Sequence, residues 1–120
     1  MEYLNRVLGL KVMYQDEKIK PVPNFIAARY RIQKVTLDGE TALFVYPREE
    51  LDPVDAVKKH MERIQKVEGA PAVLILDRLT YRQKQYLLRD HIPFVVEEKQ
   101  IYLPFMRSIY RNVEMAKGGR

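Results

Sequence analysis

Two helical segments alternate with three short apolar segments between residues 42 and 97. The apolar segments, 42–46, 72–76 and 93–97, have the length of strands, and the segments between them, 54–68 and 80–90, have helical spacing. A strand–helix–strand crossover gives parallel neighbouring strands and is nearly always right-handed. The order of these five segments therefore predicts a sheet with a parallel centre that is packed by helices.

The segment 54–68 has the clearest helical pattern. Its apolar residues recur at intervals of three and four and are Val54, Val57, Met61, Ile64 and Val67. This spacing places them on one helical face, which has to be buried. We expect Asp52 to cap the first turn, Pro53 to take the first helical position and Gly69 to end the helix. A capping box, Thr80 to Gln83, predicts the start of the next helix.

Two hairpins are predicted, one before and one after these crossovers. In the first, RYRIQKVTL and TALFVYP flank Asp38-Gly39, a pair that suits the two positive-φ positions of a tight turn. In the second, IPFVVE is followed after two residues by QIYLPF. Each hairpin adds an antiparallel strand to the sheet.

The residues before the first hairpin predict one short helix and an arm. Leu4, Val7 and Leu8 share a helical face, and Gly9 is expected to end that helix. Residues 10–24 contain two prolines and no clear period, so we expect an extended arm or loop. The predicted fold class is α/β: a mixed sheet of about five strands with two crossover helices, two β-hairpins and an N-terminal helix. It forms a single domain, residues 1–106.

Composition narrows the class of protein. Apolar residues make up 47% of the 120 residues and charged residues 31%, as in ordinary globular proteins. The absence of cysteine excludes disulfides and thiolate metal sites and fits the reducing cytoplasm. No apolar run is long enough to span a bilayer, and the opening MEYLNRVLGL lacks the apolar core of a signal peptide. We therefore expect a cytoplasmic protein without membrane contact.

A nuclease site is one interpretation of the acidic residues near the strand ends. Asp77 follows the segment 72–76, and Glu97 and Lys99 follow the next predicted strand. Two carboxylates can hold a divalent cation, and a lysine beside them can orient water or contact a phosphate. The alternative, which we favour, is that Asp77 is a loop residue and that Glu97 and Lys99 belong to a hairpin turn. An enzyme, a metal site and a cofactor are not expected.

The helix 80–90 and the residue before it carry a second candidate, a nucleic-acid contact. Its cationic residues are Arg78, Arg82, Lys84 and Arg89, with Tyr81 and Tyr86 between them. Cations of this kind contact phosphates, and tyrosine rings stack on bases. The alternative, which we favour, is that Tyr86, Leu87 and Leu79 face the sheet and the arginines form the solvated side of an amphipathic helix.

The two histidines do not suggest a metal site. His60 is expected on the polar side of the helix 54–68. His91 is expected near a helix C-terminus, where a partly charged imidazole complements the helix dipole.

Two long stretches carry a resemblance to a known family. They are PVPNFIAARYRIQKVTLDGETALFVYP and the block from PVDAVKKH to KQIYLPF, of which LDRLTYRQKQYLLRDHIPFVV is the most specific part. In composition and order they resemble the N-terminal domain of MarR-type winged-helix transcription regulators of Firmicutes, over about residues 4–106. Where that group has a glycine in the turn before KQIYLPF, this chain has Glu97-Glu98, so we expect Glu98 to hold a conformation that glycine adopts more easily.

The resemblance implies a non-catalytic regulatory or dimerisation domain. In that group a winged helix follows this strand and binds DNA, so DNA contact is implied only through that domain. Residues 107–120 are too few to build a winged helix, and we expect a tail that leads to a DNA-binding domain absent from this chain. The implied partners are that winged helix and a second copy, as a homodimer.

QIYLPF is also expected to be an outer strand of the sheet. Ile101, Leu103 and Phe105 would then lie on one face and Tyr102 on the other. From this position we predict that the surface around Tyr102, Phe105 and Ile109 is a protein contact.

Overall fold

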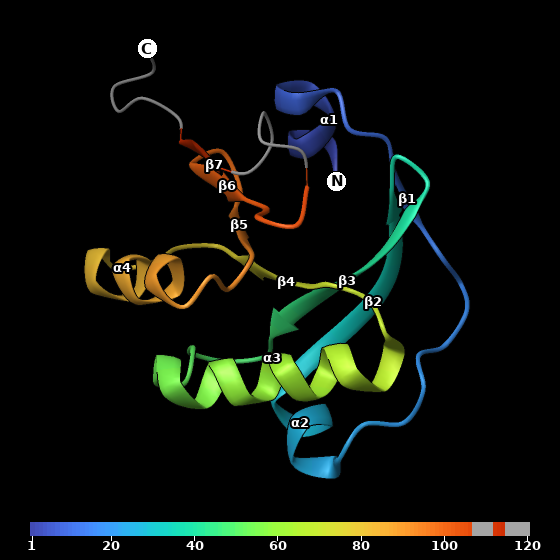
Figure 1. The fold of residues 1–120 in the computed structure, drawn as a ribbon, viewed down its shortest axis with the longest axis vertical. Helices are drawn as coiled ribbons and strands as arrows, with labels where there is room; N and C mark the ends of the chain where they lie inside the picture. The colour runs from blue at the N-terminus through green and yellow to red at the C-terminus, as the bar shows by residue number, and fades with distance from the viewer. Residues whose placement is uncertain (107–111, 115–120) are drawn as a thin grey trace.

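In the part of the chain that the structure describes, seven strands form one mixed sheet whose order in space follows the order of the sequence (Figure 1). The computed structural model describes residues 1–106 and, for the backbone only, 112–114. The strands are β1 (Val12–Tyr14), β2 (Tyr30–Leu37), β3 (Glu40–Pro47), β4 (Ala72–Leu76), β5 (Phe94–Val96), β6 (Gln100–Tyr102) and β7 (Asn112–Glu114).

The parallel centre of the sheet is confirmed. β3 pairs in parallel with β4, and β4 pairs in parallel with β5. The remaining pairs, β1–β2, β2–β3, β5–β6 and β6–β7, are antiparallel. The predicted mixed sheet with two crossover helices, two hairpins and an N-terminal helix is therefore correct in class, although the sheet has seven strands where about five were expected.

The described residues form four helices, of which three pack on one face of the sheet and one on the other (Figure 1). They are α1 (Glu2–Leu8), α2 (Asn24–Arg29), α3 (Val54–Glu68) and α4 (Tyr81–Arg89). α2, α3 and α4 contribute Ile26, Ile64 and Leu87 to one buried cluster, together with Leu74 of β4. On the opposite face, Leu4 of α1 packs with apolar side chains of the central strands.

The expected arm at residues 10–24 is corrected by the strand β1. Lys11 lies beside the Asp38 turn: its backbone carbonyl accepts from the Asp38 amide (2.9 Å), and its amide donates to the Asp38 side chain (2.7 Å). Three residues are too few to show a period of two, and β1 pairs only because β2 is present. α2 begins directly after Pro23 and packs Ile26 into the core.

The helix starts confirm one predicted cap and correct another. Thr80 and Gln83 form the expected capping box at α4, with hydrogen bonds of 3.1 and 2.9 Å. α3 has Pro53 as its N-cap and no side-chain cap. Asp52 lies instead 3.3 Å from the Arg29 guanidinium of α2. The prediction that Asp52 caps α3 was therefore wrong, because a tertiary ion pair takes its carboxylate.

The two predicted turns have the expected backbone. Asp38 and Gly39 have φ angles of 49° and 88°, as the two-residue hairpin requires. Val96 pairs with Gln100, so Glu97, Glu98 and Lys99 form the turn of the β5–β6 hairpin. Glu98 has a φ of 66°, which confirms that it holds a left-handed conformation.

The expected position of QIYLPF at the edge of the sheet is corrected by β7. β6 lies between β5 and β7, and Ile101 and Leu103 are fully buried. The split of this segment between the two faces is confirmed, since Ile101 and Leu103 pack on the α1 side and Tyr102 on the other. β7 itself falls within residues 107–120, which had been expected to be a tail.

We predict that Leu74→Ala lowers the free energy of unfolding by about 2–4 kcal/mol, because truncation of a central leucine leaves a cavity. Leu74 is fully buried and is paired with Val45 on one side and Phe94 on the other. Urea unfolding measures the change. Met13→Ala, at a side chain that is 54% exposed, serves as the control and is expected to change stability by less than about 0.5 kcal/mol. Equal effects of the two substitutions would contradict a buried β4.

We also predict that Glu98→Gly is more stable than Glu98→Ala by about 1 kcal/mol, because only alanine keeps the steric cost of a left-handed residue. Both variants lose the exposed ion pair between Arg6 and Glu98, so the comparison isolates the backbone. At Glu97, which does not have a positive φ, alanine is expected to be the more stable of the two. Thermal melts of the four variants test this, and the same order at both positions would contradict it.

Candidate functional site

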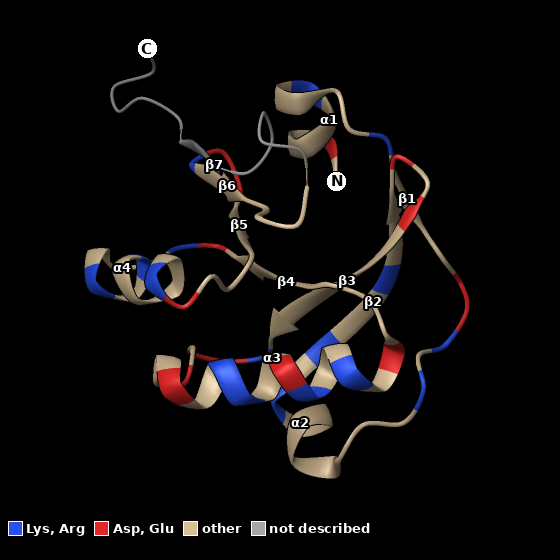
Figure 2. Ribbon diagram, in the orientation of Figure 1, with Lys and Arg blue, Asp and Glu red and all other residues tan. Residues whose placement is uncertain are grey.

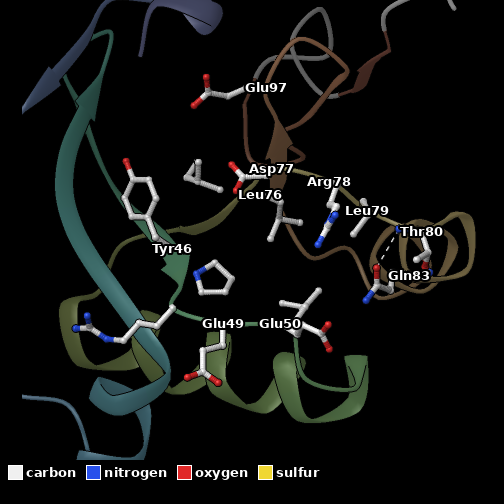
Figure 3. Close-up of a pocket in the computed structure, with 14 residues that line it drawn as sticks. Tyr46, Glu49, Glu50, Leu76, Asp77, Arg78, Leu79, Thr80, Gln83 and Glu97 are labelled. Carbon is white, nitrogen blue, oxygen red and sulfur yellow. Dashed lines mark hydrogen bonds between the residues drawn. The ribbon is translucent and has the colours of Figure 1, made fainter.

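The carboxyl ends of the parallel strands line an open hollow of about 690 Å³. Asp77 directly follows β4, and Glu97 directly follows β5. Both line this hollow, with Tyr46 at the end of β3. In Figure 3, Asp77 and Glu97 extend from neighbouring strand ends toward the side where Tyr46 lies. The register of β4 and β5 explains the arrangement, since Leu76 pairs with Val96 immediately before the two acids.

Lys99 does not join the two carboxylates. It lies in the hairpin turn, where its amide donates to the Val96 carbonyl (2.9 Å), and it is not among the residues that line the hollow. Of the three residues considered for a nuclease, the structure brings Asp77 and Glu97 to one edge and leaves Lys99 outside. Within the described residues, no group of three or more histidine, cysteine, aspartate or glutamate side chains is placed to hold a metal ion.

Beside the hollow, Arg31 stacks on Tyr46. The Arg31 guanidinium carbon lies 3.9 Å from the centre of the Tyr46 ring. Burial raises the pKa of Tyr46, with smaller contributions in the same direction from Tyr14 and then from Glu97, and Arg31 opposes the rise. The pair was missed from the sequence, although a two-residue turn at Asp38-Gly39 places these residues directly opposite each other on β2 and β3.

The outer face of α4 combines exposed rings with cations. Tyr81 is 75% exposed and Tyr86 is 39% exposed. The Lys84 amine lies 5.7 Å from the centre of the Tyr81 ring, and the Arg89 guanidinium lies 4.7 Å from that of Tyr86. Arg89 also forms two hydrogen bonds of 3.1 Å with Asp90. Figure 2 shows Lys and Arg on α4 without an acidic residue inside the helix.

The expected inward side of α4 is therefore only partly correct. Leu87 is fully buried and Leu79 packs against the core, as predicted. Tyr86 was expected to face the sheet, yet it lies on the exposed side. A nine-residue helix that buries one side chain deeply leaves most of its circumference to solvent.

His60 is not on a solvated face, which corrects its expected position. Its side chain is only 11% exposed, and its Nδ1 lies 2.7 Å from the Tyr30 hydroxyl and 4.0 Å from Asp52. Burial and then the Asp52 charge raise the pKa of Tyr30 to about 12, so this phenol keeps its proton and can donate to His60. Burial lowers the pKa of His60, and Asp52 opposes that shift.

We predict that His60 makes the fold less stable at acidic pH. Because the pKa of His60 in the fold lies below its ordinary 6.5, the unfolded chain binds the proton first as the pH falls. Its contribution to stability is thus complete above pH 6.5 and decreases below it. Urea unfolding at pH 7.5 and pH 5.0 should show a smaller loss for His60→Gln than for the wild type. His91→Gln, which removes an exposed histidine, should lose as much stability between pH 7.5 and pH 5.0 as the wild type. An equal loss of stability in all three proteins would contradict the role of His60.

The three residues of the predicted protein contact have different surroundings. Tyr102 is only 9% exposed, and its hydroxyl lies 3.2 Å from Nδ1 of His91. Phe105 is 37% exposed, just after β6. Ile109 lies outside the described residues. In the described part of this surface, Phe105 is thus the member that is accessible to a partner.

Comparisons of this chain with protein-family models, with curated proteins and with solved structures found no match. None of the helices in the described ranges, 1–106 and 112–114, is both long and apolar enough to cross a membrane.

Proposed function

We propose that this chain is a non-catalytic regulatory and dimerisation domain of a cytoplasmic MarR-like transcription regulator. Sequence-specific DNA reading is then carried out by a winged helix outside the chain. The partners in this proposal are that winged helix and a second copy of the same domain.

The observation that carries this proposal is the conformation of residues 97–99. They form a tight hairpin turn, and the hollow at the strand ends contains Asp77 and Glu97 but lacks Lys99. The most specific part of the resemblance, Leu76–Phe105, forms the end of β4, then α4, β5 and β6. This arrangement supports a packed structural module more than a reaction centre.

A second observation supports the contact with a partner. Phe105 is one of the exposed large apolar residues, and it lies three residues after Tyr102, the last residue of β6. An exposed aromatic side chain is suited to a protein interface.

We predict that the protein self-associates weakly and that Phe105→Ser reduces this association several-fold, because it removes an aromatic contact. Sedimentation equilibrium over a wide range of concentrations measures it. Phe25→Ser is the matched control, since Phe25 is 54% exposed on α2 and should not contribute. A wild type that stays monomeric and does not bind a supplied winged-helix segment would contradict the proposed contact.

The non-catalytic part of the proposal is tested separately by plasmid nicking in magnesium and in manganese. No nicking is expected from the purified protein. Metal-dependent nicking that is lost in Glu97→Gln would contradict the proposal and favour a nuclease.

A further inference from the structure

We propose that the outer face of α4 binds single-stranded nucleic acid, with Tyr81 as a base-stacking platform and Arg82 as a phosphate contact. This inference goes beyond the regulatory role and does not depend on it.

The arrangement of the helix supports one continuous surface. At 100° per residue, Tyr81 and Tyr86 lie about 140° apart, and Gln85, Arg82 and Arg89 project between them. The buried Leu87 lies on the opposite side. The two tyrosines thus border an exposed arc whose centre is cationic.

The charges favour a polyanion over a neutral partner. Among the described residues, no ion pair holds Arg78 or Arg82, and α4 contains no acidic residue. The acids nearest in sequence are Asp77 and Asp90 at the two ends, and Asp90 is already bound to Arg89. Asp52 and Asp55, near the start of α3, line a hollow together with Arg82 and Arg89. Among the cations of this arc, Arg82 is therefore the one best placed to neutralise a phosphate.

The exposed rings favour single strands over duplexes. Tyr81, at 75% exposed, has most of its surface in solvent, whereas a purely acidic partner would not need an aromatic ring. Tyr81 and Tyr86 are about 7.5 Å apart along the axis and about 140° apart around it, so their rings are separated by well over twice the 3.4 Å spacing of stacked bases. Bases held at this spacing must be unstacked from each other, as they are in an extended single strand.

Fluorescence anisotropy with labelled 15-mers tests the proposal on the whole chain. The probes are oligothymidylate, the same length of abasic strand, and a 15-base-pair duplex, each titrated over a range of salt concentrations. We expect oligothymidylate to bind more tightly than the other two, with an affinity that falls steeply with salt. Equal binding of the abasic strand, tighter binding of the duplex, or no binding at low salt would overturn the proposal.

Substitutions at exposed positions locate the site without disturbing the core. Tyr81→Ala is expected to weaken binding about tenfold, and Tyr81→Phe to retain most of it, because the ring alone stacks. The control Tyr14→Ala changes a tyrosine that is 52% exposed on β1 and should stay within twofold of the wild type. An effect of Tyr14→Ala equal to that of Tyr81→Ala would overturn the assignment to α4.

The phosphate contacts have their own matched pair. Arg82→Ala should weaken binding and lower the slope of log affinity against log salt by about 0.7, the value for one phosphate contact on a single strand. Arg63→Ala removes the same charge from the exposed side of α3 and should leave the slope unchanged. Equal changes in slope would mean that net charge, and not this helix, governs binding.

Discussion

Burial of β4 on both faces is the constraint on which the rest of the fold depends. All five residues, Ala72–Leu76, are buried, and they alternate between the two apolar clusters. A strand of this kind is stable only when apolar side chains cover both sides of the sheet. α3 and α4 provide the cover on one side, and the short α1 provides it on the other. The two crossovers and the N-terminal helix thus have the same structural role, which is to cover β4.

The burial of the central strands also determines where charged side chains can lie. Side chains of the central strands are committed to packing, so charged groups reach this region only after the strands end, as Asp77 and Glu97 do. α1 is seven residues long and covers only part of its face. Arg31 and Tyr46 occupy the part of that face near the hollow. There the guanidinium stacks on the ring, which stabilises its charge and covers the apolar face of the ring.

Local patterns were sufficient for the elements that depend on local physics. The stripe of α3, the capping box of Thr80 and the Asp38-Gly39 turn each act within a few residues, and each could be predicted. β1, α2 and β7 could not, because their few residues become regular only against neighbours distant in sequence. The same is true of Asp52, which was predicted to cap a helix but pairs with Arg29, 23 residues away. His60 was placed on the wrong side of its helix for this reason: Tyr30 of β2 takes its Nδ1.

The candidate site shows why spacing alone does not define a reaction centre. In a strand, residues two apart project from the same face, so a Glu-x-Lys sequence there would bring both side chains to one place. Here Glu97 and Lys99 lie in a three-residue turn whose middle residue, Glu98, has a positive φ, and the alternation is broken. Glu97 is directed to the hollow by β5, which precedes it, whereas the backbone of Lys99 is held by the turn. On α4, in contrast, the spacing in the sequence does predict which side chains lie together. Helical periodicity holds Tyr81, Arg82 and Tyr86 on one exposed arc, independently of the sheet.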